Sequence, residues 1–187
     1  MGVLKSPQPV LLIMGVLYGD RVRLDEAESR LAAGMGEIEV KSQAFDFDVT
    51  GYYEGEMGPD LKRVFLAFKN LIDPGNIVDI KLAAVGIEED MSVGGRRTVN
   101  LDPGYMDFNK LVLVSAKFLA NKIYIGRGVY ADPTMYYDKG WITYEWAFPD
   151  FRSGRYSDFF AEVRDLYKRK MRQSGGAGGG QNRQMSA

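Results

Sequence analysis

Cysteine and histidine are both absent from this chain of 187 residues. Without cysteine there is no disulfide bond, no thiolate nucleophile and no ligand set for an iron–sulfur cluster. Without histidine there is no Ser-His-Asp or Cys-His triad, and zinc and haem lose their usual ligands. Oxygen-ligated cations such as Mg²⁺ or Ca²⁺ are the metals that this composition still allows. The cofactor is therefore unknown, with Mg²⁺ as a candidate.

An excess of charge is also absent, because 24 Lys and Arg residues are balanced by 25 Asp and Glu residues for a net charge of -1. Such a chain has no overall field that attracts DNA, RNA or an anionic membrane. Its first apolar run, Val10–Leu17, is too short to cross a bilayer. We therefore expect a cytoplasmic protein that binds neither nucleic acid nor membrane.

Length and composition predict one folded domain. A hydrophobic fraction of 45% and a charged fraction of 26% are ordinary for a globular protein. We expect residues 1–172 to form a single domain. The end of the chain, "SGGAGGGQNRQMSA", has little to bury, so residues 173–187 are expected to form a flexible tail.

Hydrophobic patterns in the first half predict alternating strands and helices. The run Val10–Tyr18 is typical of a central strand, and a helix follows that ends at Gly34. Residues 37–49 predict a second strand with an irregularity near Ser42. Residues 61–72 fit a strand or a short helix, and we favour the strand. Asp73 and Pro74 then open a second helix.

The second half is rich in aromatic residues. Residues 109–122 fit either a strand or a helix, and periodicity does not separate the two. Residues 122–148 predict an antiparallel hairpin, and a C-terminal helix begins near Ser157. The order strand, helix, strand, strand, helix, strand predicts an α+β fold with a ferredoxin-like βαββαβ core, extended by the aromatic hairpin and the C-terminal helix. A doubly wound sheet is the alternative.

Paired carboxylates in "YYEGEMG" form the first candidate site. Glu54 and Glu56 are two residues apart, so in an extended segment both side chains point the same way. With Asp102 they are the candidate metal ligands. The alternative is a solvated acidic loop.

The stretch "NLDPGY" forms the second candidate. Asp102, Pro103 and Gly104 satisfy the requirements of a type II turn, with proline and glycine at its central positions. The turn does not require the neighbouring donors, which suit a phosphate or a carboxylate; these are Arg97, Asn100 and Tyr105. Exposed arginines are also typical of a solvated face.

Further candidates follow "NLDPGY" along the chain. Lys110 and Lys117 are candidate bases or anion ligands, because a chain without histidine needs lysine or a carboxylate for such work. Tyr130, Asp132 and Asp150 lie in or beyond the aromatic hairpin. Surface lysines and cross-strand aromatic packing are the alternatives.

Several motifs in a fixed order resemble one family. They are "YYEGEMG", "LIDP", "NLDPGY", "KLVLVSAK", "IYIGRGVYA" and "FPDFRSGRY", within about residues 5–172. Together they resemble the bacterial and archaeal family named domain of unknown function 4416. The resemblance implies no activity. The family pattern has His-Arg where this chain has Asn121-Lys122, and glutamate where it has Asp132.

We interpret the chain as a small protein that binds an anionic small molecule, such as a phosphate or a nucleotide, with or without Mg²⁺; turnover is left open. The recurrence of charged residues of both signs beside turn residues and aromatic rings favours this function. The alternative is a non-enzymatic interaction or assembly module, including a homo-oligomer, that uses the aromatic hairpin.

Overall fold

The structure is a computed structural model that describes residues 2–177. Within these residues a large antiparallel sheet is combined with five α-helices, so the expected α+β class is confirmed. The strands are β1 Val10–Tyr18, β2 Ile38–Lys41, β3 Phe45–Asp46, β4 Lys62–Ile72, β5 Val99–Met106, β6 Lys110–Ser115, β7 Ile123–Gly126, β8 Val129–Tyr137 and β9 Trp141–Thr143. The helices are α1 Arg21–Met35, α2 Glu54–Met57, α3 Ile77–Asp90, α4 Pro149–Arg152 and α5 Ser157–Ala177, with a short 3-10 helix at Pro74–Asn76.

The sheet has the strand order β2-β4-β1-β5-β6-β8-β7, with β3 beside β4 and β9 beside β8. Strand β1 pairs antiparallel with β4 on one side and with β5 on the other. The strand expected over residues 61–72 is confirmed as β4. The irregularity expected near Ser42 is also confirmed, because there β2 ends and the Ser42 hydroxyl accepts a hydrogen bond from the Phe65 amide at 2.9 Å.

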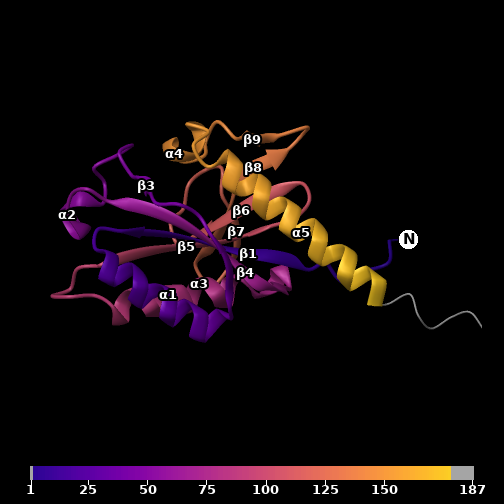
Figure 1. Ribbon diagram of the computed structural model, residues 1–187, viewed down its shortest axis with the longest axis horizontal. Coiled ribbons are helices and arrows are strands. Elements are labelled where there is room, and N and C mark those ends of the chain that lie inside the picture. Colours follow the sequence, from indigo (N-terminus) through magenta and orange to yellow (C-terminus); the bar gives the residue numbers. More distant parts are fainter. Residues whose placement is uncertain (1, 178–187) are drawn as a thin grey trace, which may run out of the picture.

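Helices cover both faces of the sheet (Figure 1). Neighbouring side chains of a strand point to opposite faces, so β1 contributes Met14 to one hydrophobic cluster and Ile13 to another. Helices α1 and α3 pack on the Met14 side, through residues such as Leu24 and Ala84. Helix α5 packs on the Ile13 side through residues such as Phe160. The uniformly apolar β1 is thus explained by a core on both of its faces.

Two buried charged residues attach α3 to β5. Lys81 donates a hydrogen bond to the carbonyl of Leu101 at 2.8 Å, and Glu88 accepts one from the amide of the same residue. Burial raises the pKa of Glu88, and the charge of Lys81 offsets only part of this increase. Both side chains approach Leu101 from the α3 side, and alternation along the strand therefore directs Asn100 and Asp102 to the opposite face.

The turn expected at "NLDPGY" is wrong, because these residues lie inside β5. Pro103 is paired with Met14 of β1, and β6 pairs with β5 only from Gly104 onward. A proline is tolerated where one side of the ladder ends, since its missing N–H is not needed there. Gly104 provides space for β6: a Cβ atom at this position would lie 2.5 Å from the Val112 carbonyl oxygen.

Residues 109–122 form a strand followed by an irregular segment. Strand β6 ends at Ser115, and residues 116–122 contain no helix.

The predicted hairpin is confirmed as β7, β8 and β9, whose tight turns place Arg127 and Lys139 at positive φ. Helix α5 continues to Ala177, into the segment 173–187 that was expected to be a flexible tail; residues 178–187 lie outside the described residues.

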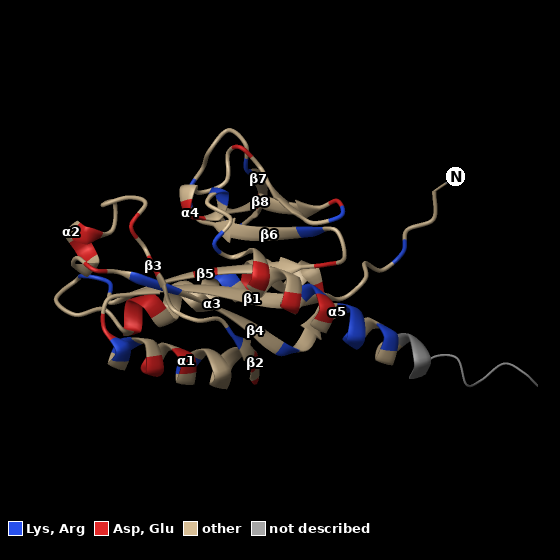
Figure 2. Cartoon of the chain, turned by 45° about the horizontal axis from the view of Figure 1, so that its top comes forward, with Lys and Arg blue, Asp and Glu red and all other residues tan. Residues whose placement is uncertain are grey.

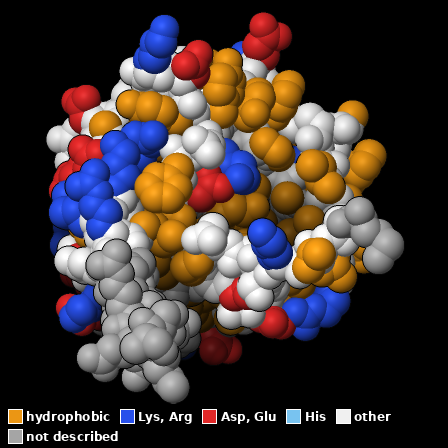
Figure 3. All heavy atoms as spheres, turned by 90° about the vertical axis from the view of Figure 1, so that its right-hand side faces the viewer, with side chains coloured by type: hydrophobic (Ala, Val, Ile, Leu, Met, Phe, Trp, Pro, Cys, Tyr) orange, Lys and Arg blue, Asp and Glu red, His pale blue; other side chains and the backbone are white. Residues whose placement is uncertain are grey.

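Charged and apolar side chains are unevenly placed on the surface. Residues of both charge signs occur along α1, and Lys and Arg residues gather toward the C-terminal end of α5 (Figure 2). Hydrophobic side chains are exposed side by side on the face shown in Figure 3. Among residues 2–177, no helix combines the length and the apolar composition that a membrane span needs.

Substitution of Gly104 tests the close approach of β5 and β6. We expect Gly104→Ala to lower the free energy of unfolding by about 1–3 kcal/mol, because the added methyl group meets the backbone of Val112 and Leu113. The matched control is Gly86→Ala in α3, where a Cβ atom meets nothing within 4 Å and alanine favours the helix by about 1 kcal/mol. Urea unfolding of both variants measures the difference, and equal effects would contradict the close approach.

Candidate functional site

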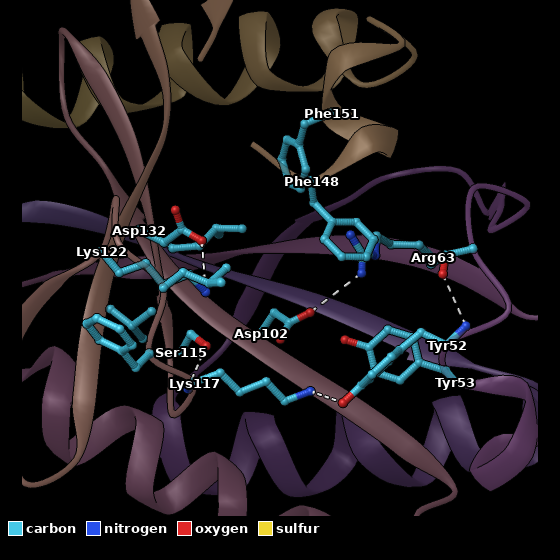
Figure 4. Close-up of a pocket in the computed structure, with 15 residues that line it drawn as sticks. Tyr52, Tyr53, Arg63, Asp102, Ser115, Lys117, Lys122, Asp132, Phe148 and Phe151 are labelled. Atoms are coloured by element: carbon cyan, nitrogen blue, oxygen red, sulfur yellow. Dashed lines mark hydrogen bonds and ion pairs between the residues drawn. The ribbon is translucent and has the colours of Figure 1, made fainter. Parts of the chain in front are cut away.

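A cavity of about 380 Å³ opens where β5 and β6 separate (Figure 4). Their pairing stops at Gly104 and Leu113, whereas β6 continues to pair with β8 as far as Ser115. Asp102 of β5 therefore lies beside the cavity rather than opposite a paired residue of β6. The lining residues are Thr50, Tyr52, Tyr53, Arg63, Asp102, Leu113, Val114, Ser115, Lys117, Phe118, Leu119, Lys122, Asp132, Phe148 and Phe151.

Arg63 lies at the inner wall of the cavity, where it forms a buried ion pair with Asp150. Asp150 is 0% exposed and also accepts hydrogen bonds from the Tyr156 hydroxyl at 2.8 Å and from the Phe151 amide at 2.9 Å. The guanidinium lies 4.7 Å from the ring centroid of Phe47. Burial acts to lower the pKa of Arg63, but the carboxylates of Asp150 and Asp102 outweigh it and raise that pKa, so the guanidinium stays charged.

A series of polar contacts connects Asp102 to the protein surface. The Oδ2 atom of Asp102 lies 3.6 Å from a terminal nitrogen of Arg63 and accepts a hydrogen bond from Asn100 Nδ2 at 2.9 Å. Asn100 in turn accepts from Arg97 at 2.8 Å. Arg97 donates to both carboxylate oxygens of Glu56, at 2.8 and 2.6 Å. These hydrogen bonds lower the pKa of Glu56 and raise that of Arg97.

Two lysines differ in their partners at the cavity wall. Lys122 is paired with Asp132, whose Oδ2 atom lies 3.1 Å from its Nζ. Lys117 donates instead to the Tyr52 hydroxyl at 2.6 Å, and its Nζ lies 4.2 Å from the centroid of that ring. This hydrogen bond lowers the pKa of Tyr52. No carboxylate among the described residues is within ion-pair distance of Lys117.

Tyr53 remains a neutral hydrogen-bonding group beside these charges. Burial, and then the negative charge of Asp102, raise the pKa of Tyr53 to about 12. Its ring packs edge-on against Tyr52, with centroids 4.9 Å apart. The phenol is therefore protonated at neutral pH and lines the cavity without adding charge.

The cavity brings together only part of the predicted site. Asp102, Lys117 and Asp132 line it. Four more predicted residues do not line the cavity but are connected to its lining residues Asp102 and Arg63 by the contacts described above; these are Asn100, Arg97, Glu56 and Asp150. Arg97 and Glu56 also line a second cavity of about 360 Å³, together with Arg23 and Arg96.

Four predicted residues lie elsewhere. Tyr105 packs with the cluster on the α1 and α3 side of the sheet. Lys110 is exposed and paired with Asp107. Tyr130 packs against Phe118 and Tyr124 rather than lining the cavity. Glu54 is exposed in α2.

The prediction that Glu54 and Glu56 lie in an extended segment and point the same way is wrong. Both residues lie in helix α2, where side chains two residues apart point in different directions. Both oxygens of Glu56 are bonded to Arg97, and only Asp102 of the expected metal ligands lines the cavity. Within residues 2–177, no group of three or more Asp, Glu, His or Cys side chains is placed to hold a metal ion.

Several lining residues were not predicted from the sequence. Arg63 had the clearest signal, since it is the only charged residue in the buried part of β4, "RVFLAF". A charge at such a position needs a partner. Tyr52, Tyr53 and Ser115 gave no such signal, because their place depends on how distant segments pack.

Comparison with known proteins identifies the family but no activity. A family model described as "Domain of unknown function (DUF4416)" matches residues 8–167, which include every lining residue of the cavity. This match confirms the resemblance predicted from the motifs. No curated protein and no solved structure matches the chain.

Removal of the charge of Asp150 tests the inner wall. We expect Asp150→Asn to lower the free energy of unfolding by about 3–5 kcal/mol, because Arg63 loses the buried partner of its charge. The matched control is Glu37→Gln, which removes the exposed partner of Lys69 and should change stability little, because solvent screens such a pair. Urea denaturation followed by circular dichroism measures both, and a loss at Asp150 no larger than the control would refute the role of the pair.

Proposed function

Because this chain belongs to the DUF4416 family, whose description assigns no activity, we propose a function from the cavity itself: it binds an anionic small molecule. The observation that carries the proposal is Lys117. Its ammonium lies at the cavity wall and has a tyrosine hydroxyl, but no carboxylate among the described residues, as its partner. A phosphate or carboxylate group of a ligand would supply the missing negative charge.

The other two cationic side chains that line the cavity are paired with carboxylates, so Lys117 is the group that we expect to bind an anion. Arg63 is paired with Asp150 and Asp102, and Lys122 is paired with Asp132. Lys117 also lies at the ring of Tyr52, and a hydroxyl and a ring both leave its charge available. The charged part of the ligand therefore needs to be a single group that reaches the position of Lys117.

Size and lining support a small ligand rather than a macromolecule. A volume of about 380 Å³ lies within the range of about 300–1,000 Å³ typical of small-molecule sites. Apolar side chains such as Leu113, Phe148 and Phe151 line it together with the charged groups. This combination is typical of a site that surrounds an apolar body and fixes one polar end.

We also propose that the first part of the chain is a ferredoxin-like core. Supporting this proposal, β1 lies between β4 and β5, and β4 lies between β1 and β2, with every pair antiparallel. Helices α1 and α3 pack against the same side of these strands. On this interpretation β6, β8 and β7 extend the core beyond β5, and the cavity lies at the junction.

Substitution of Lys117 tests the proposed function. In a thermal-shift screen with inorganic phosphate, small carboxylates and nucleotides, a ligand at about 100 times its Kd stabilises the protein by about 2.7 kcal/mol. We expect Lys117→Met to weaken binding about tenfold, which reduces that stabilisation to about 1.4 kcal/mol. Lys110→Met is the matched control, because Lys110 is an exposed lysine outside the cavity. Equal shifts in both variants would contradict the role of Lys117.

A second candidate function is assembly through the aromatic hairpin. Tyr144 and Trp146 are stacked with centroids 4.5 Å apart, and Tyr136 packs against Tyr144 at 5.1 Å. Trp146 and the nearby Ile142 are exposed. Neighbouring exposed apolar side chains favour contact with another protein or a second copy of this chain.

Sedimentation velocity over a range of concentrations tests this candidate. If the hairpin associates, the wild-type protein should show a dimer that dissociates on dilution, and Ile142→Asp should be monomeric, because it places a charge in the apolar contact. Val22→Asp changes an equally aliphatic exposed residue on α1 and should leave the dimer intact. A wild-type protein that is monomeric at all concentrations would argue against assembly.

A further inference from the structure

Asp102 presents an unoccupied hydrogen-bond acceptor to the cavity. Its Oδ2 atom is bonded to Asn100 and lies near Arg63, whereas no residue in the described part of the chain donates to Oδ1. The side chain is 29% exposed, and in Figure 4 it lies between Arg63 and Lys117. A carboxylate oxygen only accepts hydrogen bonds when it is ionised, so the ligand group that reaches it must be a donor.

The rim of the cavity exposes apolar side chains that a ligand would cover. Phe118, Leu119 and Phe148 are 70%, 54% and 40% exposed. The ring of Phe148 is held in place by stacking on Phe47, with centroids 6.0 Å apart and planes at 13°. Aromatic rings held in this way favour the face or edge of another ring. The ligand body that suits this rim is therefore planar and largely apolar.

The two polar positions differ in sign, which restricts where the ligand carries its charge. Lys117 favours an anion, whereas Asp102 repels one and favours an N–H donor. A free phosphate ion would satisfy Lys117 but leave both the rim and Asp102 without contacts. A ligand with negative charge at both ends would meet repulsion at Asp102.

We propose, as a refinement that rests on the proposed function, that the ligand is a nucleoside monophosphate whose base carries an exocyclic amino group. The amino group donates to Asp102 Oδ1, the base packs against the aromatic rim, and the phosphate pairs with Lys117. The Ser115 hydroxyl, which accepts a hydrogen bond from the Lys117 amide at 3.0 Å, is a further donor for the phosphate.

Neighbouring contacts determine how an amide at position 102 would be oriented. Asn100 Nδ2 donates to Oδ2, and a guanidinium nitrogen of Arg63 lies on the same side. In Asp102→Asn the amide oxygen would occupy this position, because two donors would otherwise face each other. The NH₂ group would then point toward the ligand. A donor would thus replace the acceptor that the wild-type protein presents.

Titration calorimetry with two matched nucleotides tests the inference. Adenosine 5′-monophosphate carries an amino group on its six-membered ring, and inosine 5′-monophosphate carries an oxo group at the same position. We expect wild-type protein to prefer the adenine nucleotide by about tenfold to a hundredfold, the usual effect of a hydrogen bond to a charged group. Asp102→Asn should shift the preference toward the inosine nucleotide. A misfolded variant cannot bind one ligand more tightly than before, so this gain separates specificity from stability.

Controls separate this inference from the proposed function. Asp138→Asn, at an exposed position in the turn between β8 and β9, should keep the wild-type preference. If both nucleotides bind wild-type protein equally and Lys117→Met weakens both, anion binding stands and the role of Asp102 is wrong. If neither nucleotide nor inorganic phosphate binds, the proposed function and the refinement both fail.

Discussion

The ion pair between Arg63 and Asp150 is the interaction on which the rest of the site depends. A fully buried carboxylate is costly unless its charge and lone pairs are satisfied, and Asp150 meets that condition with three donors from β4, α4 and the segment before α5. Those contacts fix α4 against the sheet, and α4 carries Phe151, with Phe148 just before it. The apolar wall of the cavity therefore has its position because a charge is buried behind it.

The same arginine is the first of five polar side chains that contact one another in sequence. The ion pair from Arg63 to Asp102 is followed by hydrogen bonds that connect Asp102, Asn100, Arg97 and Glu56. Positive and negative side chains in the series offset each other, so it carries little net charge. Within residues 2–177, no donor reaches Oδ1 of Asp102, and Lys117 at the cavity wall has only a neutral hydroxyl as its hydrogen-bond partner. Specificity in such a site comes from the few groups that the protein itself leaves unsatisfied.

Sequence patterns predicted the elements better than the site. The strand Val10–Tyr18 and the hairpin turns near Gly128 and Gly140 depend on local rules of burial and turn chemistry, and these predictions are confirmed. Lys117 was predicted as a candidate base or anion ligand and Asp132 as a candidate in the aromatic hairpin, but their convergence at one cavity depends on long-range packing. Glu54 and Tyr105 lie away from the cavity for physical reasons. Glu54 is in the unexpected helix α2, and alternation along β5 places Tyr105 on the α1 and α3 side of the sheet.

The hexapeptide "NLDPGY" was wrongly predicted to form a turn, yet its Asp102 lines the cavity. Proline and glycine indicate a turn when only local geometry is considered. Inside a sheet they have another effect: Gly104 lets β6 approach closely, and Pro103, without an N–H, coincides with the end of the ladder. Beyond that point β6 follows β8, and β5 continues beside β1. The separation leaves Asp102 beside an opening between β5 and β6, and Asp102 is the one residue of the hexapeptide that lines the cavity.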